Sequence, residues 1–144
     1  MASYLKFNKF TQGLCQKLFQ LESDVLKFAL TNTAPTAATD TVFLPGSLHP
    51  PPAAANGYTT GGHAATISGS AETGGVYTLA TTTDVVITAT AGGIGPFRYV
   101  ILYDDTSTSD SLICYWDYGS SITLASGETF TIDVTTSIFT LTTT

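Results

Sequence analysis

The sequence has few charged side chains for its length. Only 11% of its 144 residues are Asp, Glu, Lys or Arg, against roughly 25% in an ordinary globular chain. Low charge together with 43% hydrophobic residues excludes a disordered polyelectrolyte, because disorder normally pairs low hydrophobicity with high net charge. The formal net charge of −6 argues against nucleic acid as a direct partner.

Positive charge is almost absent after residue 27. All four lysines occur in the first 27 residues, and Arg98 is the only base in the remaining 117 residues, which carry nine acids and a net charge of −8. The N-terminal segment therefore presents a different surface from the rest. The segment contains Lys6, Lys9 and Lys17.

Cysteine is scarce, and no apolar run is long enough to cross a bilayer. Cys15 and Cys114 are far apart without CxxC spacing, so no disulfide framework is predicted. A membrane-spanning helix needs about 20 apolar residues, and the sequence has no such run. Gln12, Gln16 and Lys17 interrupt the apolar core that a signal peptide would need. We expect synthesis in a reducing cytoplasm and no membrane partner.

The residues that catalysis needs are also scarce. His49 and His63 lie in Pro- or Gly-rich segments without a carboxylate at motif spacing, whereas acid–base and nucleophilic catalysis need a positioned proton carrier. Cys15, on a predicted helix face, and Cys114, in an aromatic strand, are interpreted as packed, inert thiols. We predict that the protein is not an enzyme and uses no cofactor.

Two loops share only part of a ligand-binding motif. Residues 104–110 carry oxygen ligands at alternate positions but lack the glycine and the final Glu of an EF-hand loop, so we expect a solvated hairpin tip and no metal. Residues 92–95 are glycine-rich but lead into a predicted strand, which offers no helix N-terminus to an anion. Arg98 is expected to pair with an acid, either in the sheet or at an interface.

Hydroxyl side chains supply the polarity that charge does not. The sequence contains 27 threonines and 12 serines. Threonine is β-branched and suits a pleated, half-exposed surface. The composition therefore favours a β-rich fold.

The N-terminal segment has the period of an amphipathic helix. Apolar residues recur at steps of three or four, which places them on one helical face. Asn8 is a suitable N-cap. The spacing predicts a helix over residues 7–23 that docks on its own domain. The apolar positions are Phe7, Phe10, Leu14, Leu18, Leu21 and Val25.

After residue 24 the period changes to two. Alternation over residues 26–30 predicts a half-buried strand, and residues 32–39 are typical of a turn. Residues 45–63 are rich in Pro, Gly and Ala, and their triple proline favours an extended polyproline II conformation. We interpret this stretch as an arm or loop.

Residues 64–144 are predicted to form a β-rich body within a single domain of residues 1–144. Short strands separated by turns every 8–12 residues are typical of a sandwich or barrel. We predict a mainly antiparallel β-sandwich, with a jelly roll as one possible form, and one N-terminal helix. Residues 97–103 should be central, with 112–118 beside them, and residues 125–128 should connect a hairpin. The expected strands are 64–68, 76–80, 85–90, 97–103, 112–118, 122–124, 129–134 and 138–142.

Three stretches of the chain, in this order, resemble a family of small virion proteins of tailed bacteriophages. They are LKFALTNTAP at residues 26–35, NGYTTGG at 56–62 and GPFRYVILY at 95–103. The similarity in order and character covers most of the chain, and its motifs are structural rather than catalytic. Residues 42–52, which include the triple proline at 50–52, are less typical of the family.

The resemblance implies a capsid decoration, or cement, protein that binds and stabilises the lattice of the major capsid protein. Such a protein would lie on the capsid exterior and form homo-oligomers, for which a trimer is the natural expectation in a symmetric shell. An extended proline-rich arm would lose little entropy on wrapping a neighbour. The resemblance also implies that the N-terminal segment, with Lys6, Lys9 and Lys17, meets an acidic capsid surface. The arm residues expected to contact a partner are Pro50, Pro51, Pro52, Asn56, Gly57 and Tyr58.

Two other classes of function stay open at this stage. One is a tail or head–tail joining component, which would form rings of sixfold or twelvefold symmetry. The other is a receptor- or carbohydrate-binding module, such as a head fibre or adhesin, in which exposed aromatic rings stack on sugars. The rings considered for that role are Tyr58, Tyr115, Trp116 and Tyr118.

Overall fold

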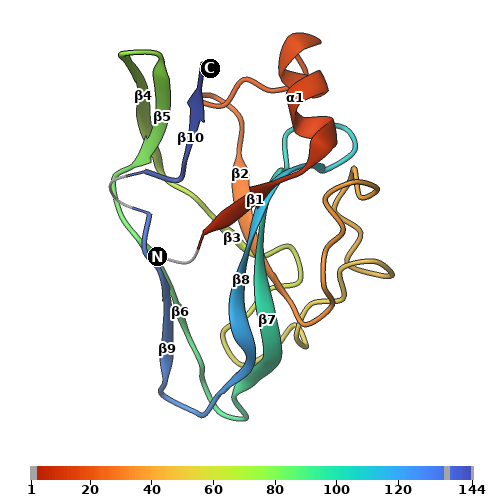
Figure 1. Ribbon diagram of the computed structural model, residues 1–144. Coiled ribbons are helices and arrows are strands. Elements are labelled where there is room, and N and C mark those ends of the chain that lie inside the picture. Colours follow the sequence, from red (N-terminus) through yellow and green to blue (C-terminus); the bar gives the residue numbers. More distant parts are fainter. Residues whose placement is uncertain (1–2, 135–136, 144) are drawn as a thin grey trace.

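The computed structural model describes residues 3–134 and 137–143. It confirms a mainly antiparallel β fold with a sandwich-like arrangement and a short N-terminal helix (Figure 1). The elements are β1 (Tyr4–Lys6), α1 (Asn8–Cys15), β2 (Leu26–Thr31), β3 (His63–Ala64), β4 (Ile67–Thr73), β5 (Val76–Thr81), β6 (Val85–Thr88), β7 (Ile94–Asp104), β8 (Ser111–Leu124), β9 (Thr129–Ile132) and β10 (Phe139–Thr142).

The largest sheet has the strand order β1-β8-β7-β2-β3. Its centre is β7, which pairs with β2 through Leu30↔Val100 and with β8 through Val100↔Trp116. The prediction that residues 97–103 form a central strand next to 112–118 is therefore confirmed. Arg98, on β7, forms a two-pronged ion pair with Asp117 of β8, at 2.7 and 2.8 Å. This resolves the pairing that the sequence left open.

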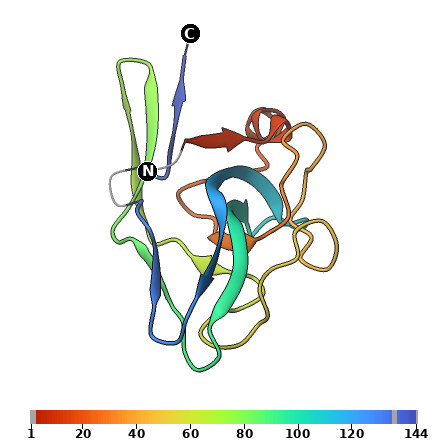
Figure 2. The same cartoon turned by 60° about the horizontal axis from the view of Figure 1, so that its bottom comes forward.

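Two smaller sheets, β10-β5-β4 and β6-β9, lie against one face of the large sheet (Figures 1 and 2). Apolar side chains from both layers form the main core, because each strand turns alternate residues inward. The large sheet contributes Phe28, Leu30, Val100, Leu102 and Trp116, and the facing layer contributes Leu79, Ile87, Ile132, Val134 and Phe139.

The other face of the large sheet is covered by irregular chain rather than by strands. The segment that leads from β2 to β3 lies along this face, drawn in orange to yellow in Figures 1 and 2. Phe43 from this segment stacks on Tyr103 of β7, with ring centroids 4.5 Å apart. Because both faces are covered, β2 is buried almost throughout, and the prediction of a half-buried strand there is wrong.

The helix is much shorter than the predicted residues 7–23. It ends at Cys15 because Lys17 adopts φ 59°, which lets Leu18 N–H donate to Gly13 O and Lys17 N–H donate to Leu14 O. This is a Schellman ending. Phe19 then folds back on Phe10, with ring centroids 5.0 Å apart. Leu18 and Val25, both predicted to be apolar-face positions, are exposed.

Four further details of the predicted elements are wrong or incomplete. Phe7, rather than Asn8, is the N-cap, and it makes no side-chain capping bond. Residues 122–124 continue β8, and the turn at 125–128 leads into β9, which pairs with β6 instead of β8. The predicted strand 64–68 is divided between β3 and β4. The short edge strand β1 was not predicted at all.

Candidate functional site

The two body cations are paired, whereas the three N-terminal lysines are not. Lys27 contacts Asp105 at 2.7 Å, and Arg98 contacts Asp117. Within the part of the chain that the structure describes, Lys6, Lys9 and Lys17 form no ion pair, and all three are exposed. Lys9 Nζ donates to the neutral Gln12 Oε1 at 2.6 Å, so all three positive charges lack a compensating carboxylate among the described residues, on a chain whose net charge is −6.

The free lysines lie on β1, α1 and the turn that ends α1. β1 is an edge strand of the large sheet, paired with β8 on one side only. Leu5 is 56% exposed and Leu18 is 45% exposed, so apolar area accompanies the charge. We call the exposed side chains of Leu5, Lys6, Lys9, Lys17 and Leu18 the N-terminal surface.

The segment 45–63 folds against the body and does not extend from it as an arm. Leu30 N–H donates to the Tyr58 hydroxyl at 2.8 Å, and the Thr31 hydroxyl donates to Pro50 O at 2.9 Å. Asn56 Nδ2 donates to Gly93 O at 3.0 Å. These bonds tie the segment to β2 and to the turn before β7. Three of the six residues predicted to contact a partner, Pro50, Asn56 and Tyr58, therefore form hydrogen bonds within the fold.

Exposure divides the six predicted arm residues. Tyr58 is only 3% exposed, and this burial raises its pKa to about 12. Pro52 is buried, Pro51 and Asn56 are half-buried, and Pro50 and Gly57 are exposed. Gly57 has φ +95°, and a Cβ there would lie 2.1 Å from Thr88 O. Tyr58 and Pro52 are therefore core residues, and Gly57 is required by close packing.

A buried histidine pins the neighbouring loop, a feature that the sequence did not reveal. The His49 ring is fully buried, with Nε2 3.2 Å from Asp40 Oδ2, and its Nδ1 accepts from Leu44 N–H at 3.3 Å. Burial lowers the pKa of His49, with Asp40 opposing the shift. The ring also stacks on Phe43, with centroids 5.8 Å apart. The loop consequently holds Leu44 and Leu48 in exposed positions.

The two cysteines differ in exposure. Cys114 is buried, which raises the pKa of its thiol, as the sequence predicted for an inert residue. Cys15 is exposed, so the prediction of a packed thiol there is wrong. Burial lowers the pKa of His63, whose ring lies 5.8 Å from that of Tyr58. In residues 3–134 and 137–143, no group of three or more His, Cys, Asp or Glu side chains could hold a metal ion.

The 104–110 loop is the connection between β7 and β8, as predicted. Asp104 Oδ1 accepts from the backbone N–H groups of Thr106 and Ser107 at 2.8 and 3.1 Å. Asp104 is fully buried, and its Oδ2 faces the Asp24 carboxylate with no donor among the described residues. Burial and the nearby Asp24 charge raise the pKa of Asp104 to about 6. This carboxyl shapes the turn.

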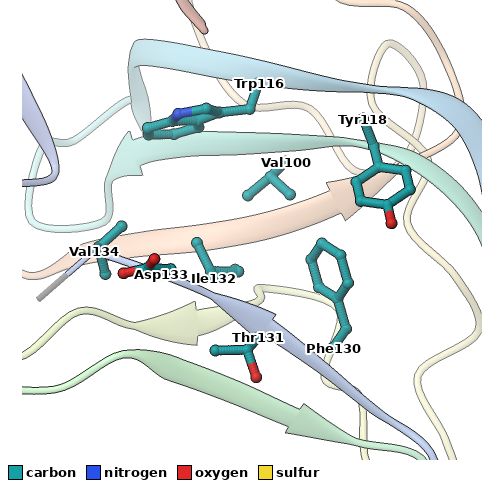
Figure 3. Close-up of a pocket in the computed structure, with 8 residues that line it drawn as sticks. All are labelled: Val100, Trp116, Tyr118, Phe130, Thr131, Ile132, Asp133 and Val134. Carbon is teal, nitrogen blue, oxygen red and sulfur yellow. The ribbon is translucent and has the colours of Figure 1, made fainter. Parts of the chain in front are cut away.

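A cavity of about 200 Å³ lies between the two layers, beside β8 and β9 (Figure 3). In Figure 3, Tyr118 and Phe130 lie at one end of the cavity, and Trp116, Asp133 and Val134 lie at the other. The lining is mostly apolar or aromatic, and it consists of Val100, Trp116, Tyr118, Phe130, Thr131, Ile132, Asp133 and Val134.

Most of the aromatic rings considered for sugar stacking are core residues. Tyr58, Tyr115 and Trp116 are 3%, 8% and 6% exposed. Tyr118 is 59% exposed and is therefore the one of the four rings available on the surface. No protein-family model, curated protein sequence or solved structure matches this chain. In the described residues, no helix is long and apolar enough to cross a membrane.

Proposed function

We propose that this chain is a non-enzymatic structural protein of a tailed-phage virion, most specifically a capsid decoration protein that binds the major capsid protein. The observation that carries the proposal is the N-terminal surface, where three exposed lysines have no ion-pair partner among the described residues. The resemblance of residues 26–35, 56–62 and 95–103 to small phage virion proteins supplies the class of partner.

Charge complementarity supports an acidic partner surface. The free lysines would lose little hydration at the rim of an interface, and their attraction acts over about 8–10 Å at physiological salt. The acidic remainder of the chain would be repelled by the same surface, so the charge asymmetry favours one orientation. Leu18, the exposed neighbour of Lys17, would add apolar contact.

A decoration protein acts through many copies, so the affinity of each single contact can be low. Identical weak interfaces repeated over a symmetric lattice act together through avidity. We expect the protein to form homo-oligomers, trimers at threefold positions, on the capsid exterior. A segment already folded against the body, as residues 45–63 are, binds with little loss of entropy, so its exposed Pro50 is available as a preformed contact.

The test is binding of purified protein to capsids that lack it, measured by co-sedimentation. Charge reversal of the three lysines (Lys6→Glu, Lys9→Glu and Lys17→Glu together) should weaken binding at least about tenfold, and salt should weaken binding of the unaltered protein. The matched control replaces the same three residues by arginine, which keeps the charge and should retain binding. Equal occupancy by the glutamate and arginine variants would contradict the proposed contact.

A receptor- or ligand-binding module is the second candidate function. The observation in its favour is the interlayer cavity with the exposed Tyr118 at one end. Binding of the purified protein to host cells, with no binding to capsids, would favour this function over decoration.

A further inference from the structure

The interlayer cavity opens where the large sheet loses its edge strand. β1 pairs with β8 only from Cys114 to Trp116, so the later part of β8 has no neighbour on that side among the described strands. β9 pairs with β6 alone. The two strands are joined by the turn at 125–128 and diverge from it, which leaves the cavity between them (Figures 1 and 3).

Aromatic rings form much of its wall. The Tyr118 and Phe130 rings meet edge to face with centroids 6.1 Å apart, and Phe130 is held in turn by Phe97 at 5.0 Å. Trp116, 6% exposed, lines the other end. The faces of such rings carry negative electrostatic potential, which attracts cations and repels anions.

The one charge in the lining is also negative. Asp133 is exposed and is the only Asp, Glu, Lys, Arg or His among the residues that line the cavity, and no ion pair to it is formed within the described residues. A second carboxylate, Asp84, accepts from the backbone N–H of the lining residue Val134 at 2.8 Å. β7 and β8 carry one positive side chain, Arg98. It does not neutralise Asp133, because it is paired with Asp117.

We propose that this cavity binds a small organic cation of the trimethylammonium class, with the positively charged trimethylammonium head inside the aromatic lining and Asp133 adding negative potential from one end. A methylated ammonium group suits the site better than a primary one. A primary ammonium needs three hydrogen-bond acceptors, and leaving them unmet in an apolar cavity is costly. A trimethylammonium group has no N–H to satisfy, and aromatic surfaces recognise it well.

The size of the cavity agrees with this class of ligand. An apolar cavity of roughly 150 Å³ accommodates benzene, so about 200 Å³ accommodates a group such as the head of choline. Larger ligands would have to extend past Tyr118, which is 59% exposed. The inference goes beyond the proposed function and does not depend on it.

The test uses choline and its uncharged isostere 3,3-dimethyl-1-butanol as probes of the full-length protein. Trp116 is the single tryptophan and lines the cavity, so its fluorescence reports occupancy directly, and NMR chemical-shift changes locate it. We expect saturable, millimolar binding of choline and at least threefold weaker binding of the isostere. Equal binding of both probes, or no saturable change with choline, would overturn the proposal.

Two substitutions test the contribution of the Asp133 charge and that of the Tyr118 ring separately. Asp133→Asn and Tyr118→Leu alter exposed side chains, so neither removes core packing. Each should weaken choline binding about two- to fivefold, and Asp133→Asn should leave binding of the isostere unchanged. Glu128→Gln is the matched control, because it removes one exposed negative charge from the same β8–β9 region outside the lining. If Glu128→Gln and Asp133→Asn weakened choline binding equally, the effect would come from the overall negative charge of the protein and not from Asp133 at the cavity, which would contradict the assigned site.

Discussion

His49 Nε2 lies 3.2 Å from Asp40 Oδ2, while Nδ1 of the same ring accepts a hydrogen bond from Leu44 N–H. This pattern fixes the neutral tautomer that carries its proton on Nε2. Protonation of Nδ1 would turn the acceptor into a donor facing another donor. The ring therefore couples the loop over the second sheet face to pH.

Acid should loosen this loop. Because burial lowers the pKa of His49 below its usual 6.5, the unfolded chain takes up a proton first as pH falls. Stability from this group is complete above pH 6.5 and decreases as pH falls below it. Burial also lowers the pKa of His63, so His63 contributes to the loss of stability in acid in the same direction. Asp104 titrates in the same range with the opposite sign, so the loss is measured as a difference: thermal stability between pH 8 and pH 5 should fall more steeply with acid in the unaltered protein than in the His49→Gln variant. An identical slope in both proteins would contradict the assignment.

Asp104 has the opposite linkage. Its pKa is raised to about 6 by burial and by the Asp24 charge, so the native state holds a proton that the unfolded state releases from about pH 4 upward. Its contribution is present at low pH and is lost as pH rises through about 6. Asp104→Asn keeps the Oδ1 acceptor for Thr106 and Ser107 and removes the buried charge. We expect it to raise the free energy of unfolding by about 1–2 kcal/mol at pH 7.5, measured by urea denaturation. A destabilised variant at that pH would refute this.

Gly57 tests the close packing of the 45–63 segment. Gly57→Ala would place a Cβ 2.1 Å from Thr88 O at φ +95°, and should cost more than about 2 kcal/mol of unfolding free energy. Gly74→Ala is the control. Gly74 has φ +61° with nothing within 4 Å, so only the left-handed backbone penalty of about 1–2 kcal/mol applies. Equal losses in the two variants would mean that residue 57 is not tightly packed.

The Tyr58 hydroxyl is predicted to be structural. It accepts from Leu30 N–H at 2.8 Å in the core, so Tyr58→Phe leaves a buried backbone donor unsatisfied and should cost about 1–3 kcal/mol. Tyr118→Phe, at an exposed ring, should change stability by less than about 0.5 kcal/mol. Chemical denaturation of both variants checks this. Unchanged stability of Tyr58→Phe, with reduced capsid binding, would instead restore Tyr58 as a contact residue.

The strands were predictable because their signal is local. Residues 97–103 and 112–116 are nearly continuous apolar runs, and β7 from residue 99 onward and β8 up to Trp116 are buried on both faces, as such runs require. The predicted helix was too long for a reason that is also local. The apolar period continues through Leu18 and Val25, but Lys17 takes a positive φ that sequence rules reserve mainly for glycine.

The long-range features could not be read from the sequence. Asp40 and His49 meet across an irregular loop with no motif spacing. The Tyr58 bond to Leu30 of β2 joins residues 28 positions apart in the sequence, so it depends on how the chain between them folds. The interlayer cavity depends on β9 pairing with β6 rather than with β8, which is a choice of strand order. The structure shows Lys6, Lys9 and Lys17 exposed, and the contact of these lysines with a partner stays a prediction.

The most direct test of the account is the stoichiometry and symmetry of this protein in purified virions, determined by low-resolution imaging of the particles. A decoration protein predicts hundreds of copies at threefold or quasi-threefold positions on the capsid exterior, with the N-terminal surface toward the lattice. A few copies in a sixfold or twelvefold ring would move the protein to the tail or the head–tail joint. Its absence from particles would contradict the virion assignment altogether.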